Sequence, residues 1–277
     1  MRLFICGVRG STPSPGQAFV RYGGNTSAIA LAHPGQGPTL VLDAGTGLQR
    51  LTPLLNGQPF RGSILLSHLH WDHTHGIPFF AGGDRPDAEI TLVMPAQGDP
   101  ANVLARVMSP PHFPIKPSEL RGKWRFLGIQ EGPRPVEGFD VIAREIPHKG
   151  GLTYGYRVSG DGATIAYLSD HSPIAFGAGP AGFGAYHPAA IALARGVDLL
   201  IHDAQLTSAE FAALAPFGHS AVEYAVGLAE AAGAKRLLLY HHDPARTDEQ
   251  IDAIVAAYRG NAIPVDAAAE GTVIDLG

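Results

Sequence analysis

The sequence predicts an α/β protein with a single domain. Short apolar runs typical of strands alternate with amphipathic stretches typical of helices along all 277 residues. Both halves combine strands with helices, and no linker rich in Pro, Gly or Ser separates them. Hydrophobic residues make up 45% of the chain and charged residues only 16%, which is enough apolar side chain for a large core. We therefore expect residues 1–277 to fold as one domain.

The first half predicts strands wherever a short apolar run is bounded by Gly, Pro or Asp. The Gly- and Pro-rich stretch 7–24 predicts a loop, and three prolines in residues 109–114 exclude a helix interior there. Helices are expected at Thr46–Leu55 and Ala101–Val107. The expected strands are Leu3–Cys6, Ser27–Ala32, Thr39–Leu42, Ser63–Ser67, Ile90–Met94 and Trp124–Leu127.

The second half follows the same pattern, with apolar periodicity strongest in Ser220–Ala232. The Gly-rich stretch 176–187 predicts a loop. The expected strands are Phe139–Ile146, Leu152–Val158, Thr164–Leu168, Val197–Ile201, Leu237–Tyr240 and Val273–Leu276. The expected helices are Pro188–Arg195, Ser208–Leu214, Ser220–Ala232 and Asp248–Tyr258.

Charge and cysteine content restrict the partners and the compartment. The net charge is −5, so we do not expect a long nucleic acid as a partner. Cys6 is the only cysteine, which excludes an intramolecular disulfide and fits a reducing compartment. It lies in an apolar run, where we expect it in the core. The N-terminus has no signal-peptide pattern and no apolar run reaches the length of a membrane span, so we expect a cytoplasmic protein without membrane contact.

Thirteen histidines in a chain with few charges point to a metal site. His68, His70, Asp72 and His73 follow an expected strand within six residues. Residues two apart share a side of an extended chain, so His68 and His70 can bind one ion together. Asp72 and His73, at the turn after them, can face a second ion. Imidazole and carboxylate are a ligand set for Zn²⁺, and Mn²⁺ or Fe also accept it.

The motif His-x-His-x-Asp-His resembles that of the metallo-β-lactamase superfamily. The resemblance implies a four-layer αββα sandwich, with two mixed sheets face to face and helices outside. It also implies two Zn²⁺ ions and further ligands at later strand ends. His148 matches a third imidazole for the first ion, Asp170 a carboxylate that bridges both ions, and His241 an imidazole for the second ion. The neighbouring His242 is the alternative to His241.

Three N-terminal segments, Gly-Val-Arg-Gly-Ser-Thr-Pro, Gly-Gly-Asn-Thr-Ser and Leu-Asp-Ala-Gly-Thr-Gly, are similar to the ribonuclease Z and cyclic-nucleotide phosphodiesterase branch. So are His202-Asp203-Ala, with Asp in place of Glu, and Gly-His219-Ser-Ala. This resemblance implies phosphodiester hydrolysis by water activated between two metal ions. Asp72 would hold the proton of that water. His219 would contact the phosphate and donate a proton, with Asp203 as its orienting partner.

The substrate is expected to be a small phosphodiester such as a cyclic nucleotide. In the branch that this chain resembles, tRNA processing uses a long arm between the third His ligand and the bridging Asp. Here only 22 positions separate His148 from Asp170, and two expected strands fill them. Alternatives that stay open are tRNA 3′ processing, hydrolysis of a β-lactam or another ester, and a non-catalytic ligand sensor. Redox chemistry at two irons is disfavoured, because His70 stands where that class has Glu.

The sequence allows two alternative roles for several further residues. Trp71 and the pair Phe79-Phe80 offer aromatic surface for a base or an acyl group, or pack in the core. His75 and His171 flank the expected ligands and either support them or bind elsewhere. Asp43 is expected to form hydrogen bonds behind the metal loop. Residues 109–114 form a lid, a contact in a homodimer, or a plain connection.

Overall fold

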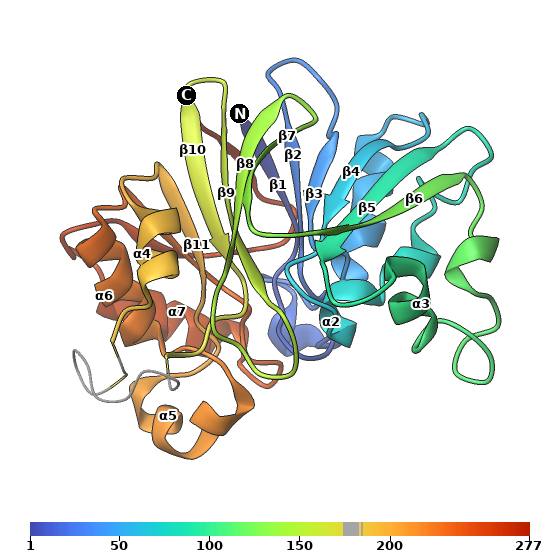
Figure 1. The fold of residues 1–277 in the computed structure, drawn as a ribbon. Coiled ribbons are helices and arrows are strands. Elements are labelled where there is room, and N and C mark those ends of the chain that lie inside the picture. The colour runs from blue at the N-terminus through green and yellow to red at the C-terminus, as the bar shows by residue number, and fades with distance from the viewer. Residues whose placement is uncertain (174–182, 184) are drawn as a thin grey trace.

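Two β-sheets form the centre of the structure. The computed structural model describes residues 1–173, 183 and 185–277. Within these residues each sheet has seven strands, in the orders β14-β1-β2-β3-β4-β5-β6 and β13-β12-β11-β10-β9-β8-β7. In Figure 1 the two sheets lie side by side, with helices on the outer face of each.

The first sheet combines an antiparallel part, β14 to β3, with a parallel part, β3 to β6. Its strands are β1 (Arg2–Gly7), β2 (Ala28–Ala32), β3 (Leu40–Leu42), β4 (Arg61–Leu65), β5 (Glu89–Pro95), β6 (Lys123–Ile129) and β14 (Val273–Asp275). The second sheet is antiparallel from β7 to β10 and parallel from β10 to β13. Its strands are β7 (Gly132–Val136), β8 (Phe139–Glu145), β9 (Tyr154–Gly160), β10 (Ala163–Leu168), β11 (Leu199–Asp203), β12 (Leu237–Tyr240) and β13 (Val265–Ala267).

Helices cover the outer faces of both sheets. The α-helices are α1 (Leu51–Leu54), α2 (Trp71–Thr74), α3 (Pro100–Ala105), α4 (Pro188–Ala194), α5 (Ser208–Leu214), α6 (Val222–Ala232) and α7 (Asp248–Ala257). Short 3₁₀ helices are η1 (Gln17–Phe19), η2 (Thr46–Arg50), η3 (Ile77–Phe79), η4 (Pro117–Glu119) and η7 (Ala215–Phe217). None of the helices in the described part of the chain combines the length and apolarity needed to span a membrane.

Three apolar clusters hold these layers together. The central cluster packs side chains of one sheet, such as Leu31, against side chains of the other, such as Val158. A second cluster packs α4 and α6 on the outer face of the second sheet, and a third packs η2, α1 and α3 on the outer face of the first. Strands β2, β3 and β12 are buried along their whole length, because both of their faces are covered. The expected αββα sandwich is confirmed, and Cys6 is buried in the third cluster.

The structure differs from the expected elements at several places. Strands β7 and β13 were not expected, and β4 ends two residues before Ser67. The expected helix Thr46–Leu55 begins as the 3₁₀ helix η2 and becomes α-helical only at Leu51. The expected loop 176–187 lies outside the described residues, except at 183 and 185–187.

The direction of the parallel strands determines at which edge of the sheets the expected ligands lie. Parallel strands that share a sheet end at the same edge, and open α/β sheets bind ligands outside the carboxyl ends of such strands. Asp43 follows β3, and the segment from His68 to His73 follows β4. In the other sheet Asp170 follows β10 and His241 follows β12. The expected ligands therefore come from one edge of the sandwich.

Candidate metal centre

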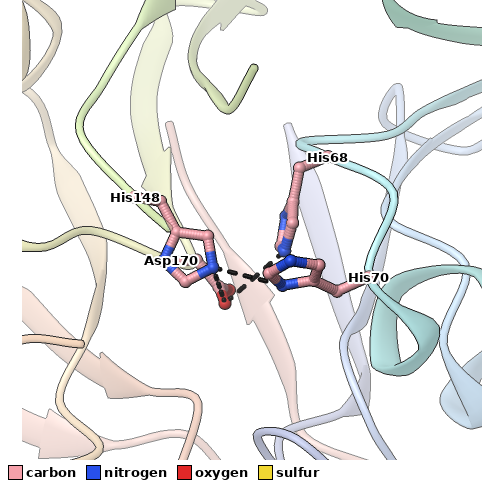
Figure 2. A group of neighbouring side chains, drawn as sticks. All are labelled: His68, His70, His148 and Asp170. Atoms are coloured by element: carbon pink, nitrogen blue, oxygen red, sulfur yellow. Dashed lines mark hydrogen bonds and ion pairs between the residues drawn. The ribbon is translucent and has the colours of Figure 1, made fainter. Parts of the chain in front are cut away.

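Four side chains, which we call the first pocket, meet beside the end of β4: His68, His70, His148 and Asp170. Figure 2 shows the three imidazoles turned towards one carboxylate. His148 Nε2 lies 3.2 Å from His70 Nδ1. Asp170 Oδ2 lies 3.5 Å from His148 Nε2 and 3.7 Å from His68 Nε2.

Next to it lies the second pocket, formed by Asp72, His73, Asp170 and His241. His241 Nε2 lies 3.0 Å from Asp72 Oδ2, 3.2 Å from Asp170 Oδ1 and 3.3 Å from His73 Nε2. Asp170 belongs to both pockets, because its Oδ1 faces the second and its Oδ2 faces the first. The structure thus brings together all seven side chains that were predicted from the sequence as metal ligands.

The spacing of these atoms fits metal ions. Ligand atoms about 2.0–2.1 Å from a tetrahedral Zn²⁺ lie roughly 3.3 Å from one another. The closest pairs in the two pockets span 3.0 to 3.7 Å. His68 Nε2 is buried and makes no hydrogen bond within the described residues. Buried polar atoms are normally paired, so this nitrogen points to a ligand that it binds instead.

Four of the histidines are fixed from behind. In each, Nδ1 donates a hydrogen bond to an oxygen, which leaves the lone pair of Nε2 directed at the pocket. The same arrangement orients histidine ligands in metalloproteins generally. The four bonds run from His73 to Asp43 Oδ2 (2.8 Å), from His241 to Gln205 Oε1 (3.0 Å), from His148 to the Gly218 carbonyl (2.7 Å) and from His68 to Ser67 Oγ (3.0 Å).

Asp43 is the centre of the supporting network, as expected. It is fully buried at the end of β3 with a positive φ of 61°. Its carboxylate accepts hydrogen bonds from Ser67 N (2.6 Å), Ser67 Oγ (2.8 Å) and Tyr167 Oη (2.8 Å), besides the one from His73. Asp43 therefore ties the metal loop to both sheets, since Tyr167 lies on β10.

The buried imidazoles of the two pockets differ in the direction of their pKa shifts. Burial holds the pKa of His68 well below its ordinary value, and His73 adds to this effect. Burial also opposes a charge on His73, but Asp170 and Asp72 outweigh it and raise the pKa of that imidazole well above its ordinary value. Burial would raise the pKa of Asp72, yet His73 and the hydrogen bond from His241 hold it well below its ordinary value. Burial also opposes the charge of Asp170, but His241 and His73 outweigh it and hold its pKa well below its ordinary value. Asp72 and Asp170 are thus both ionised and available to a cation.

His219 and Asp203 lie beside the pockets. His219 Nδ1 donates to Asp203 Oδ2 over 2.9 Å, so Asp reaches the imidazole in spite of being one methylene shorter than Glu. Burial lowers the pKa of His219, but Asp203 and Asp170 outweigh it and raise that pKa to about 9. Asp203 is fixed in turn by the backbone N–H groups of Gln205 (3.0 Å) and His171 (3.3 Å).

A cleft of about 330 Å³, the metal cleft, opens over both pockets. It gives solvent and a small molecule access to the candidate ligands and to His219. Its lining residues are Ser11, Leu69, His70, Trp71, Asp72, Asp170 and His219.

Sequence reasoning missed two supporting residues. Gln205 accepts from His241 and approaches Ser11 Oγ at 3.4 Å, and Ser11 N donates to Asp72 Oδ2 over 2.7 Å. Gln205 lies two residues past β11, at the same sheet edge as Asp170 and His241, and that position was the available signal.

Other nominated residues lie away from the pockets. His242 Nε2 contacts the Ala268 carbonyl at 2.9 Å, so His241 and not His242 faces the second pocket. Phe80 is 1% exposed and packs on Phe60, which overturns its reading as substrate surface. His75 stacks on Trp71, and His171 Nε2 contacts the hydroxyl of Tyr224.

Comparison with known proteins identifies the family. The family model described as "Beta-lactamase superfamily domain" matches residues 39–242, a span that contains all seven candidate ligands. The chain belongs to the beta-lactamase superfamily. The expected hydrolase class is confirmed at the level of this superfamily. The His and Asp cluster of the chain fits metal ions, as the expected metal dependence requires.

Relatives and solved structures within the superfamily agree with the fold. A ribonuclease Z of Methanothermobacter thermautotrophicus is 27% identical over 266 residues, covering 78% of this chain and 80% of the relative. The short form of human tRNase Z matches with a TM-score of 0.67 and 22% identity over 100% of both chains. A diphosphatase from the PhnP family matches with a TM-score of 0.68 and 17% identity over 100% of this chain and 98% of its own. The two structural likenesses show the shared fold.

Proposed function

We propose that this protein hydrolyses small phosphodiesters, such as cyclic nucleotides, with water activated between two bound Zn²⁺ ions. The observation that carries the proposal is the His219–Asp203 pair beside two adjacent metal pockets. A phosphodiester is an anion with a poor alkoxide leaving group. A fixed, protonated imidazole attracts that anion and supplies the proton that the alkoxide needs.

Two divalent cations, when bound, would lower the pKa of a water and hold the phosphoryl oxygen. His68, His70, His148 and Asp170 would hold one ion, and Asp72, His73, Asp170 and His241 the other. The same donors would accept Mn²⁺ or Fe in place of Zn²⁺.

Asp72 and His219 would handle the protons. Asp72 is ionised and lies in the wall of the metal cleft, so it can accept a hydrogen bond from the attacking water and then its proton. His219 keeps Nδ1 on Asp203, and its Nε2 proton is available to the leaving oxygen. Its pKa of about 9 means that the imidazole is charged at neutral pH. Cations bound nearby would lower this pKa towards the range that suits a general acid.

Three observations support a small substrate. The metal cleft has a volume of about 330 Å³. The chain between His148 and Asp170 is occupied by β9 and β10, which belong to the second sheet. The net charge of −5 also disfavours binding of a long polyanion, which requires many cationic contacts to phosphates.

Processing of tRNA 3′ ends is the second candidate. It is favoured by relatives named ribonuclease Z, which are 26 to 28% identical and cover most of the chain. Such an activity would require RNA to approach the metal cleft by a surface other than an arm between β8 and β10.

A panel of substrates tests the proposal. We expect the zinc-loaded protein to turn over bis(p-nitrophenyl) phosphate and a 2′,3′- or 3′,5′-cyclic nucleotide, while precursor tRNA and a cephalosporin stay intact. His68→Ala should abolish turnover, whereas His33→Ala, outside both pockets, should not. Turnover of the cephalosporin alone would refute the proposal, and cleavage of precursor tRNA alone would establish the second candidate.

A further inference from the structure

A second hollow, which we call the apolar groove, lies between η3, the end of α3 and residues 109–114. Its volume is about 440 Å³, within the range of roughly 300–1,000 Å³ typical of small-molecule sites. Leu104, Met108 and Ile77 are buried and form its floor. The main apolar lining is Ile77, Phe79, Leu104, Val107, Met108 and Phe113.

The rim of the apolar groove exposes large apolar side chains. Phe79 is 59% exposed and Val107 39% exposed, and Trp71, in the adjoining metal cleft, is 62% exposed. Phe79 packs edge-to-face on Phe113, with 5.8 Å between ring centroids. Apolar side chains gathered around a hollow are typical of a binding site, because exposing them to water costs free energy that a ligand recovers.

A third hollow borders both the apolar groove and the metal cleft. It has a volume of about 230 Å³. It shares the lining residues Leu69 and His70 with the metal cleft, and Leu104 and Val107 with the apolar groove. The apolar groove is therefore separated from the candidate ligand His70 only by the residues that line this third hollow.

We propose that the apolar groove binds an apolar ester arm, alkyl or aryl, of the phosphodiester substrate. The inference rests on the proposed function, because it places the phosphate at the metal pockets. An acyclic phosphodiester has two separate ester arms, and water displaces one of them as an alcohol while the other stays on the phosphate. In a cyclic nucleotide both ester oxygens belong to one ribose, so the inference concerns the acyclic members of the proposed substrate class. Binding of the retained arm in the apolar groove would hold the phosphorus beside His70 and leave the departing oxygen for His219 to protonate.

Matched substrates test this inference. Methyl p-nitrophenyl phosphate and octyl p-nitrophenyl phosphate release the same chromophore and differ only in the retained arm. For the zinc-loaded protein we expect kcat/KM to be at least about 10-fold higher for the octyl ester, the discrimination that one well-buried methylene gives. Val107→Asp and Phe79→Ala, both at exposed positions, should bring this ratio close to one. Val20→Asp, an exposed apolar position outside the apolar groove, should leave the ratio and the activity unchanged.

The outcomes separate this inference from the proposed function. Turnover of both esters with equal kcat/KM overturns the inference and leaves the phosphodiesterase proposal intact. A preference for the octyl ester that survives both groove substitutions also overturns it. Turnover of neither ester also overturns the inference, while bis(p-nitrophenyl) phosphate and the cyclic nucleotides decide the phosphodiesterase proposal separately. Sedimentation tests the alternative that a second copy of the chain covers the apolar groove. That alternative holds, and the inference is wrong, if Val107→Asp converts a dimer into a monomer while the ratio of kcat/KM between the octyl and methyl esters does not change.

Discussion

The two metal pockets use the same kinds of side chain but differ in how the protein supports them. All four residues of the second pocket are buried, whereas His70 of the first is only partly buried and borders the metal cleft. In the second pocket His73 is backed by Asp43 and His241 by Gln205. The first pocket has three imidazoles and one carboxylate, and the second has two of each.

This difference predicts that the two pockets bind their ions with different affinities. A buried pocket with two carboxylates and fixed imidazoles would bind its ion tightly, because its donors are oriented before the ion arrives. The first pocket has one carboxylate instead of two and a partly exposed His70, so it would bind its ion less tightly and leave room for the substrate. The asymmetry therefore comes from the number of carboxylates and the exposure of one donor, together with the charged partner Asp43 behind His73.

Removing the shared carboxylate should have the largest effect, because both pockets depend on it. Asp170→Ala is expected to abolish turnover of bis(p-nitrophenyl) phosphate and to lower bound zinc from two ions per chain to one or none, as measured by atomic absorption. Asp275→Ala, an exposed carboxylate paired with Arg2, is the matched control. Two ions retained in Asp170→Ala would contradict its assignment to both pockets.

Replacing His219 distinguishes a proton donor from a third ligand position. His219→Ala is expected to lower kcat by about 10²–10⁴-fold, the usual contribution of general acid catalysis, with both ions still bound. Zinc content and kcat are measured on the same sample. Loss of an ion would instead make His219 a ligand, as its proximity to His241 and Asp203 permits.

Weakening the support behind His73 should affect the second pocket selectively. Asp43→Asn keeps the size of the side chain but loses its charge, and we expect zinc affinity of the second pocket to fall about 10–100-fold. Tyr167→Phe removes only one hydrogen bond to Asp43 and should have a smaller effect. Competitive titration with a chromophoric chelator measures the zinc affinity of each pocket. An equal loss in both pockets would show that Asp43 supports the whole loop and not one ion.

Removing the ions should have the smallest effect, on stability. Each ion at about 100 times its Kd adds about 2.7 kcal/mol, so two ions add about 5 kcal/mol. About 2–4 °C per kcal/mol applies to chains slightly shorter than this one, so we expect chelation of both ions to lower Tm by roughly 10–20 °C. The more open first pocket should release its ion first as chelator is added. Release of both ions in one step would remove the distinction between the pockets.

The candidate ligands could be predicted from the sequence because the segment from His68 to His73 resembles the motif of the superfamily and the later ligands match its positions after strands. His148, Asp170 and His241 come after apolar runs that had to be strands, and the edge that they share follows from the direction of those strands. Gln205 also follows a strand, but this position alone does not distinguish it from other polar residues at the same edge. Its role depends on the tertiary position of the His241 ring, which no local pattern encodes.

The elements that escaped prediction are those whose local signals are weak. Strand β7 contains Pro133 and Pro135, which argue against a strand, but it lies at the edge of its sheet, where missing N–H donors are tolerated. Strand β13 has only three residues and also lies at an edge. Phe80 appeared equivalent to Phe79 in the sequence, and only packing shows that one faces inward and the other outward.

The single carboxylate of Asp170 has a thermodynamic consequence. Its two oxygens face different pockets, so an ion that binds on one side fixes the rotamer that the other side requires. Ordering the side chain once for two ligands makes the second association easier, and linkage requires the effect to be the same in either order. Each bound ion would then raise the affinity of the other pocket, and the half-loaded protein left after the first ion departs would hold its remaining ion less tightly than the fully loaded protein does.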